Sequence, residues 1–273
     1  MSGDVKAGTL VLVGCGQMGS AMLRGWLASG AAERFEIIEP AGPSAFADNS
    51  VISLHPDVAG LPASCQPDAV VLAVKPQAMD EVLPPYRRFA RPETVFLSIA
   101  AGKTISGLAR HLGDAAAIVR CMPNTPAAIG RAITVACANA HVTEHQRALC
   151  DALLAAIGES AWVAEEGLLD AVTAVSGSGP AYVFLLIEAL AEAGCKMGLS
   201  PELALRLARS TVAGSGELAV RSSDPPSRLR ENVTSPGGTT RAALDVLMSS
   251  DGLSALMQRA VAAATARSRE LAS

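Results

Sequence analysis

Three glycines near the start of the chain have the spacing of a turn that binds the phosphates of a nucleotide. Gly14, Gly16 and Gly19 follow an apolar run at residues 10–13 and precede a helical pattern at residues 20–29. In such a turn the first glycine permits a tight bend, the second lets a pyrophosphate approach the backbone, and the third lets the helix pack on the strand. The pattern predicts a dinucleotide site, with a purely structural turn as the alternative.

A carboxylate follows at the distance that a dinucleotide site requires. Glu39 lies near the end of a second predicted strand, residues 35–40, about 20 residues after the last glycine. An acidic residue there accepts hydrogen bonds from the ribose hydroxyls of the adenosine. Residues 40–44 contain no Arg or Lys for the 2′-phosphate of NADP, so Glu39 favours NAD. The alternative is a solvated charge at a strand end.

Three further predicted strands end in residues suited to a ligand site. Residues 68–76 end at Lys75 and Pro76, residues 94–102 end in small residues, and residues 116–122 lead to Asn124 between two prolines. Ligands of parallel sheets bind beyond the carboxyl ends of the strands. Asn124 is therefore a candidate contact there. Lys75 is a candidate proton donor or cofactor ligand, with an ordinary surface lysine as the alternative.

A second glycine-rich segment lies near the other end of the chain. Residues 232–241 contain a Pro-Gly-Gly turn followed by two threonines at the start of a predicted helix. Free N–H groups and hydroxyls at a helix start bind anions such as a substrate carboxylate. A capped helix after a turn is the alternative, and this segment alone does not separate the two.

The elements that would position these residues indicate two domains. Strands alternate with helices up to about residue 163, which predicts a doubly wound α/β sheet of the Rossmann type over residues 1–163. Residues 164–273 contain no convincing strand and predict an all-α domain. Its predicted helices span residues 167–175, 181–197, 201–220, 228–233, 241–248 and 253–271.

One predicted helix indicates that the chain associates with itself. Residues 182–190 are apolar almost all round, so the helix must be buried on every side. A domain of about 110 residues has difficulty covering it alone, which favours a homodimer through the helical half. A helix placed between the two domains of one chain is the alternative.

Composition excludes several other classes of function. The net charge of −4 without a long basic cluster indicates no nucleic-acid partner. The six cysteines and four histidines show no metal-ligand spacing, so we expect reduced, buried thiols and no metal. No basic segment followed by an apolar one opens the chain, and no apolar run reaches about 18 residues without a charge or Gly. We therefore expect neither secretion nor a membrane span, and a cytoplasmic protein.

Six segments in order give the chain a close resemblance to pyrroline-5-carboxylate reductase. The segments are Gly14-Cys-Gly16-Gln-Met-Gly19, Ala73-Val-Lys75-Pro76, Ser98-Ile-Ala-Ala-Gly102, Arg120-Cys-Met-Pro123-Asn124-Thr125-Pro126, Ser176-Gly-Ser-Gly-Pro180-Ala-Tyr and Ser235-Pro-Gly-Gly-Thr-Thr240. The resemblance implies reduction of the C=N bond of a cyclic imino acid, 1-pyrroline-5-carboxylate, to L-proline by NADPH or NADH. It also implies a dimer through the C-terminal helices, often assembled further into a decamer.

The resemblance further implies roles for individual residues. Those expected at the cofactor are Gly14, Gly16, Gln17, Met18, Gly19, Glu39, Ala73, Val74, Lys75, Pro76, Ala100, Ala101, Gly102 and Asn124. Those expected at the substrate are Ser235, Gly237, Gly238, Thr239 and Thr240, with Thr240 bonded to the ring nitrogen. The chain departs from the family at Glu39-Pro40, where many members carry a small polar residue and an Arg for NADP, which leaves the coenzyme preference open. It departs again at residues 222–226, to which we assign no role.

The expected chemistry agrees with the residues present. A cyclic imine is basic enough to be protonated near neutral pH, so hydride transfer needs orientation more than a strong acid. A β-hydroxyacid dehydrogenase is the alternative enzyme, but the position where that family carries its catalytic lysine holds Val183. A dinucleotide-binding regulatory protein without activity is the alternative of another class, and the intact segment at residues 235–240 argues against it.

Overall fold

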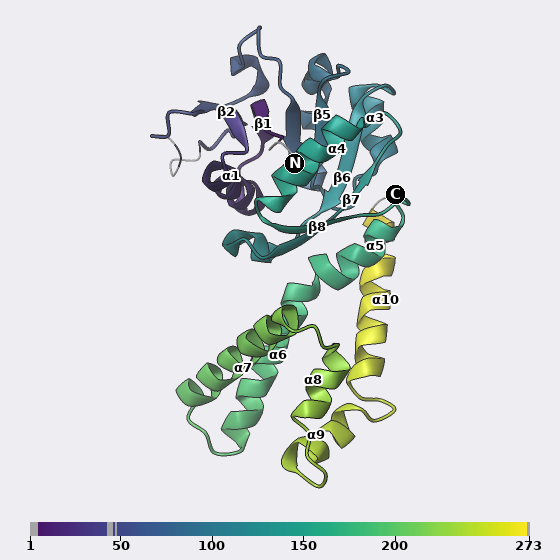
Figure 1. Ribbon diagram of the computed structural model, residues 1–273. Helices are drawn as coiled ribbons and strands as arrows, with labels where there is room; N and C mark the ends of the chain where they lie inside the picture. The colour runs from purple at the N-terminus through teal and green to yellow at the C-terminus, as the bar shows by residue number, and fades with distance from the viewer. Residues whose placement is uncertain (1–4, 43–45, 47, 272–273) are drawn as a thin grey trace. The chain divides into compact units, whose positions relative to one another are not determined.

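The apolar run before the glycine turn forms β1 (Ala7–Val13), an inner strand of an eight-stranded sheet in the computed structural model (Figure 1). The structure describes residues 5–42, 46 and 48–271. The strand order is β3-β2-β1-β4-β5-β6-β7-β8. The other strands are β2 (Ala32–Ile38), β3 (Ile52–His55), β4 (Ala69–Leu72), β5 (Val95–Ser98), β6 (Ala117–Met122), β7 (Ala132–Ala138) and β8 (Gly158–Trp162).

The order of the strands creates a ligand crevice beside β1. The chain runs outward from β1 to β3 and then returns to β4 on the other side of β1, so the order reverses between β1 and β4. Such a switch point is where open α/β sheets bind ligands. Only β6 and β7 pair antiparallel among the described strands, because residues 123–131 are too few for the crossover that parallel strands require.

Both faces of the sheet are covered, as a parallel sheet requires. Along β1, Leu10 and Leu12 belong to one hydrophobic cluster, whereas Val11 and Val13 belong to the other. The helices of this part of the chain are α1 (Gln17–Ser29), α2 (Met79–Val82), α3 (Ile105–Leu112) and α4 (Glu144–Ala155). Leu and Val therefore alternate along the end of β1, and the side chains on both faces of the strand are buried.

Two tryptophans pack in different surroundings. Trp26 on α1 is fully buried, stacks on Phe35 with ring centroids 6.5 Å apart, and donates its indole N–H to the carbonyl oxygen of Leu153 at 2.8 Å. Trp162 at the end of β8 is half-buried and donates to Asp151 at 2.7 Å. The buried ring of Trp26 therefore joins α1 to both β2 and α4.

The predicted Rossmann sheet followed by helices is confirmed, with differences in individual elements. The predicted strands at residues 68–76 and 94–102 are shorter, because β4 and β5 each contain four residues and their last predicted residues form loops. The strands β3 and β8 and the helices α2 and α3 were not predicted from the sequence. β3 is short and β8 is largely exposed, so neither has the continuous apolar run that identified the inner strands.

The helices of the second half agree closely with their predicted ranges. They are α5 (Leu168–Val172), a π-helix (Thr173–Gly177), α6 (Gly179–Lys196), α7 (Pro201–Arg221), α8 (Pro226–Asn232), α9 (Thr239–Leu247) and α10 (Leu253–Leu271). Pro201 begins α7 after Ser200, whose side chain accepts from the N–H of Leu203. The described residues after β8 contain no strand, as predicted.

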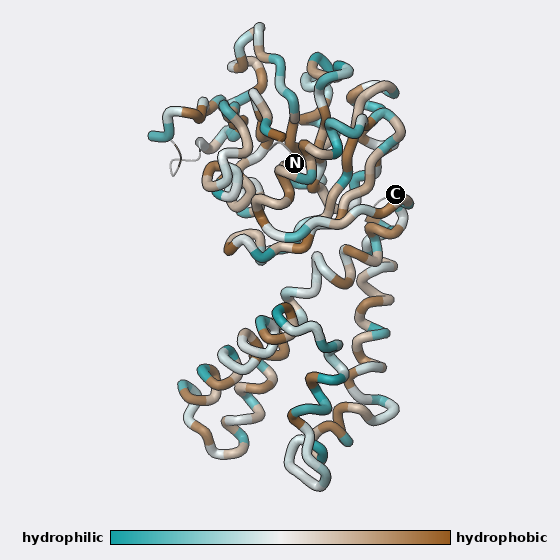
Figure 2. Tube along the Cα trace, viewed as in Figure 1, coloured by the Kyte–Doolittle hydropathy of each residue, from teal (hydrophilic) through white to brown (hydrophobic). Residues whose placement is uncertain are grey.

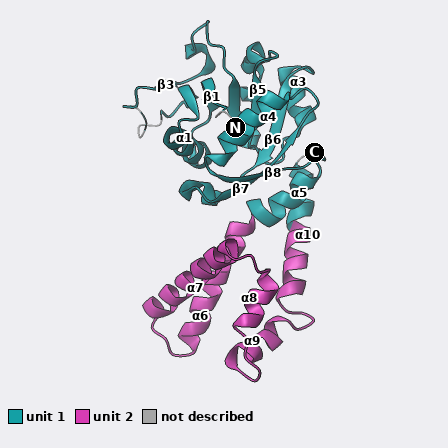
Figure 3. Cartoon of the chain, in the orientation of Figure 1, with its two compact units in different colours: residues 1–177, 264–273 teal, residues 178–263 magenta. Residues whose placement is uncertain are grey.

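The chain forms two compact units (Figure 3). The sheet unit comprises residues 1–177 and 264–273, and the helical unit comprises residues 178–263. Residues 164–177 and the end of α10 thus group with the sheet, whereas the sequence-based division placed them with the helices. That division into domains, at residues 163 and 164, stays a prediction.

The helical unit exposes much apolar surface. Phe184 and Leu185 on α6 are 59% and 63% exposed, and Figure 2 colours stretches of α6 and α7 as hydrophobic. The stretch Leu168–Lys196 is long and apolar enough to cross a membrane by length and composition alone, and only 6% of its most apolar window is buried. The single chain therefore leaves uncovered the helix that the sequence predicts to be buried.

Candidate active site

A cavity of about 510 Å³ opens at the carboxyl ends of β1, β2 and β4. Its size is typical of small-ligand sites. The cavity contains six of the predicted cofactor residues, which are Gly14, Gly16, Glu39, Ala73, Val74 and Lys75. Lining residues that the sequence argument did not select include Pro40, Asp57, Glu81 and Tyr86. Asp57 follows β3, a strand that was not predicted from the sequence. Recognising β3 would have indicated that Asp57 lies at the carboxyl edge of the sheet.

The three glycines of the turn have different surroundings. Gly14 has φ +90°, and a Cβ atom there would lie 2.8 Å from the carbonyl oxygen of Ala73. A Cβ on Gly19 would clash with the carbonyl oxygen of Gly14, whereas one on Gly16 would meet nothing within 4 Å. Gly14 and Gly19 are therefore required by the fold, and Gly16 leaves open space at the cavity.

The start of α1 fits the phosphates of a dinucleotide. The helix begins at Gln17, and no side chain caps it at Gly16 in the described structure. The first N–H groups of a helix lack intrahelical partners and attract anions. The open space at Gly16, the uncapped helix start and the cavity together fit a dinucleotide that lies across β1 and β4.

Glu39 links the glycine turn to the second strand. Its Oε2 accepts a hydrogen bond from the N–H of Cys15 at 2.8 Å, and its Oε1 accepts one from Ala41 at 3.3 Å. Burial, and to a smaller extent the Glu39 carboxylate, raise the pKa of the Cys15 thiol, which therefore stays protonated at neutral pH. Residues 43 and 44, part of the argument that excluded a basic residue, lie outside the described structure.

Charge in the cavity is mainly negative. Its charged lining residues are Glu39, Asp57, Glu81 and the single cation Lys75. Lys75 is exposed, and the described part of the chain shows no ion pair for it. Asp57 accepts from the N–H groups of Ala59 and Gly60. The described lining of the cavity thus contains one lysine and three carboxylates.

The remaining predicted cofactor residues are outside the cavity. They are Gln17, Met18, Gly19, Pro76, Ala100, Ala101, Gly102 and Asn124. Gly102 has φ +74°, and a Cβ there would lie 2.9 Å from the carbonyl oxygen of Leu271. Asn124 is buried, donates its amide to Ser176 Oγ at 3.2 Å and accepts from the N–H of Ile133 at 3.1 Å. The backbone of Leu271 therefore lies close to Gly102, and both polar atoms of the Asn124 side chain are hydrogen-bonded within the protein.

The glycine-rich segment of the helical unit forms an uncapped helix start. Gly237 has φ +69°, and the N–H of Gly238 donates to the carbonyl oxygen of Ser235 at 3.0 Å. α9 begins at Thr239, and no described side chain caps it at Gly238. The first N–H groups of α9 are consequently available to an anion, together with the hydroxyls of Thr239 and Thr240.

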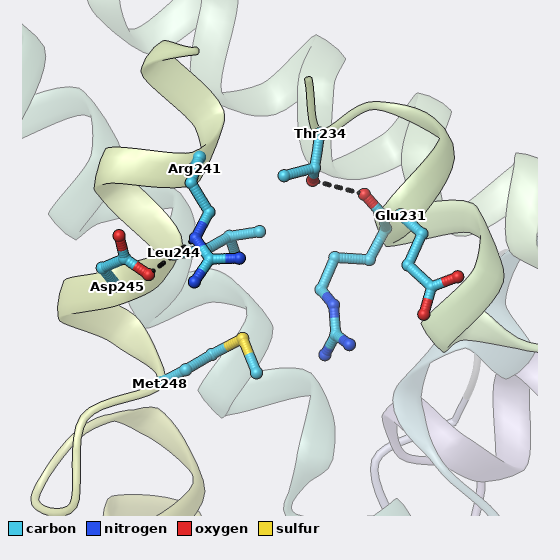
Figure 4. A pocket seen from close by; sticks show the side chains of 7 residues that line it. Glu231, Thr234, Arg241, Leu244, Asp245 and Met248 are labelled. Carbon is cyan, nitrogen blue, oxygen red and sulfur yellow. Dashed lines mark hydrogen bonds and ion pairs between the residues drawn. The ribbon is translucent and has the colours of Figure 1, made fainter. Parts of the chain in front are cut away.

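A second cavity, of about 430 Å³, lies between α8 and α9 (Figure 4). Arg230 and Arg241 line it, and Arg241 pairs with Asp245 at 2.8 Å. Thr234 donates to the backbone oxygen of Arg230 at 2.6 Å. The five predicted substrate residues, which directly follow Thr234, do not line this cavity. It is therefore adjacent in the sequence to the predicted substrate segment but is made of other side chains.

The thiols agree with the prediction only in part. All six cysteines are free and four are buried, whereas Cys65 and Cys195 are half-buried. Burial raises the pKa of the Cys121 thiol and raises that of Cys150 to about 12. No group of His, Cys, Asp and Glu side chains among the described residues could hold a metal ion.

Comparison with protein families matches both halves of the chain. Residues 166–271 match the family model described as pyrroline-5-carboxylate reductase dimerisation. Residues 9–102 match the model described as NADP oxidoreductase, coenzyme F420-dependent. The second match covers β1 to the loop after β5, which includes the cavity at the glycine turn.

Individual relatives extend the match to almost the whole chain. The pyrroline-5-carboxylate reductase of Pseudomonas aeruginosa is 39% identical, and the alignment covers 96% of both chains. The structure of a pyrroline-5-carboxylate reductase from Coxiella burnetii has a TM-score of 0.89 at 33% identity, covering 97% of this chain and 98% of that one. The Plasmodium falciparum enzyme, solved with NADP bound, has a TM-score of 0.81 at 32% identity over 97% and 98%. The chain belongs to the pyrroline-5-carboxylate reductase family of NAD(P)-dependent oxidoreductases.

Proposed function

We propose that the chain reduces 1-pyrroline-5-carboxylate to L-proline with NADH or NADPH. The observation that carries the proposal is the pairing, in one chain, of the cavity at Gly16 with the uncapped start of α9 at Gly238. The first suits a dinucleotide and the second suits a carboxylate. Family membership supports the same reaction.

The sheet unit would hold the cofactor, which supplies the hydride when bound. The N–H groups at the start of α1 would bind the pyrophosphate, and Glu39 would accept from the adenosine ribose. Residues 73–76 would line the middle of the cofactor. Ala100, Ala101, Gly102 and Asn124 would face its nicotinamide half, because the ends of β5 and β6 follow β4 along the same edge of the sheet.

The start of α9 would hold the substrate. N–H groups and hydroxyls of residues 235–240 would bind its carboxylate, and the Thr240 hydroxyl would bond the ring nitrogen. A protonated imine already carries the positive charge that accepts hydride, so orientation and exclusion of water are the main contributions of the protein. Lys75 at the cavity would interact with the cofactor or donate a proton.

Coenzyme preference and self-association are the next properties that we propose. Glu39 and the mainly negative cavity favour NADH, because a 2′-phosphate would add charge where carboxylates already lie. The match to the dimerisation family supports self-association, and we propose that the exposed face of α6 is covered by a second copy of the chain. A decamer and a cytoplasmic location are further proposals, as is the absence of a nucleic-acid or membrane partner.

A steady-state assay of the purified chain tests the proposal. 1-Pyrroline-5-carboxylate is supplied with NADH or NADPH in parallel, and oxidation of the cofactor is followed together with formation of proline. We expect turnover with both cofactors and a higher kcat/KM with NADH. Dinucleotide binding without any proline formation would contradict the proposed reaction.

A further inference from the structure

Glu166 joins three parts of the sheet unit that are far apart in the sequence. Its Oε1 accepts hydrogen bonds from the N–H of Ile105 at 2.8 Å and from Nη1 of Arg120 at 2.9 Å. Ile105 is the first residue of α3, and Arg120 lies on β6 opposite Ser98 of β5. One carboxylate oxygen therefore attaches the start of α3 to the sheet.

This contact is less exposed than an ordinary surface ion pair, although the Glu166 side chain is still 28% exposed. Arg120 is 5% exposed, and a buried guanidinium requires a charged or hydrogen-bonding partner. The carboxylate also lies at a helix start, where the helix dipole favours negative charge. Thr104 accepts from the N–H of Gly107 at 3.0 Å, so Thr104 and Glu166 satisfy different N–H groups of α3.

The same contact fixes the far end of the loop that follows β5, residues 99–104. At the near end, the N–H of Ile99 donates to the carbonyl oxygen of Leu72 at 3.1 Å. Between the two ends, Lys103 pairs with Asp80 at 2.7 Å, but Asp80 is 63% exposed and such pairs contribute little. Glu166 is therefore one of the contacts that hold the loop at its α3 end, beside the buried side chains of Leu108 and Leu112 on α3.

We propose that Glu166 is a positioning residue for the nicotinamide half of the dinucleotide, acting through residues 99–105. The inference rests on the proposed function, which assigns residues 100–102 to that half. The adenosine half is assigned to the cavity at β1, β2 and β4, whose lining contains neither Glu166 nor any residue of the loop. Loss of Glu166 should thus affect the two halves of the ligand differently.

Calorimetric titration of the full chain with NADH and with ADP-ribose, which lacks nicotinamide, measures this difference. For Glu166→Ala, which removes both hydrogen bonds accepted by the carboxylate, we expect NADH to bind about tenfold more weakly because the loop at residues 99–104 is no longer held at its α3 end. ADP-ribose should bind within about twofold of the wild type. Glu166→Gln keeps an oxygen acceptor and should lose about threefold or less for NADH. Glu165→Ala, at an exposed neighbour, should bind both ligands like the wild type.

A double variant separates positioning from stability. Arg120→Met with Glu166→Met leaves no buried charge unpaired, so it should fold even if Glu166→Ala does not. It still lacks an acceptor for the N–H of Ile105 and should show the same selective loss for NADH. Recovery of wild-type NADH affinity in this variant, or an equal loss for NADH and ADP-ribose in Glu166→Ala, would overturn the inference. Failure of the wild type to form proline would instead contradict the proposed function.

Discussion

The carboxylate of Glu39 accepts a hydrogen bond from the glycine turn and lines the cavity at the same time. Its position is therefore fixed by the protein before any ligand binds. A fixed negative charge discriminates strongly between a ribose hydroxyl and a 2′-phosphate, since only the hydroxyl can donate to it. This makes the residue pair Glu39-Pro40 the natural place to test coenzyme preference.

Replacing Glu39 by Ser and Pro40 by Arg should move the preference toward NADPH. The change removes the repelling carboxylate and adds a guanidinium that can bind a phosphate with two hydrogen bonds. We expect the ratio of kcat/KM for NADPH to that for NADH to rise about 10- to 100-fold. Glu81→Ser, which removes another carboxylate of the same cavity but adds no phosphate-binding cation, is the control and should raise the ratio much less. An unchanged ratio in the double variant would exclude Glu39 as the selector.

Thr240→Ala should slow proline formation and weaken substrate binding. The variant loses a hydroxyl that we assign to the substrate ring, so kcat/KM for pyrroline-5-carboxylate should fall about 10- to 100-fold. Affinity for NADH, measured by titration, should stay the same because Thr240 has no assigned cofactor contact. Thr240→Ser keeps the hydroxyl and should retain most of the activity. Equal losses for substrate and cofactor would contradict the assigned role.

Among the elements, the glycine turn between β1 and α1 contains two glycines that the fold requires and one that the fold does not require. Gly14 and Gly19 have no room for a Cβ atom, because backbone of the turn or of Ala73 lies against them. Gly16 has open space in the protein without ligand. The three positions look equivalent in the sequence, and the structure shows that they are not.

Alanine at two of these positions should therefore give opposite results. Gly19→Ala should lower the thermal midpoint by several degrees, because overpacking costs about 1–3 kcal/mol. Gly16→Ala should leave the midpoint unchanged and weaken NADH binding about tenfold or more, because the methyl group would occupy the approach of the pyrophosphate. Scanning calorimetry and titration measure the two effects. A Gly16→Ala protein that binds NADH normally would show that the dinucleotide lies elsewhere.

Local patterns predicted the elements with strong periodicity and missed those without it. β1 and α6 were found because apolar residues repeat along them, whereas the short strand β3 and the exposed strand β8 carry no such pattern. The cavity residue Asp57 was missed with β3. Glu166 was missed for a different reason, since its partners Ile105 and Arg120 are 61 and 46 residues away in the chain.

In the whole molecule, most of the exposed large apolar side chains among the described residues lie in the helical unit. Phe184 and Leu185 on α6 are more than half exposed, and the stretch matches the dimerisation family. The sequence anticipated this, because a helix that is apolar all round needs burial on every side. The single-chain structure leaves the helix uncovered, which agrees with the self-association that the match to the dimerisation family supports.

Phe184→Asp should therefore prevent self-association. A carboxylate on the exposed face of α6 would have to be buried without a partner in the assembly, which is strongly unfavourable. Analytical ultracentrifugation should show a monomer or an aggregating species in place of the wild-type assembly. Val51→Asp changes an exposed apolar side chain of the sheet unit and should leave the assembly intact. An unchanged sedimentation coefficient for Phe184→Asp would place the interface on another surface.

The positions of Trp26 and Trp162 make tryptophan fluorescence a probe of one unit only. Both tryptophans of the chain lie in the sheet unit, one fully buried and one half-buried. Tryptophan emission thus follows the melting of the sheet unit alone, while far-ultraviolet circular dichroism follows helices in both units. If the helical unit loses its structure first, ellipticity will fall while emission stays blue-shifted, and the two curves will separate.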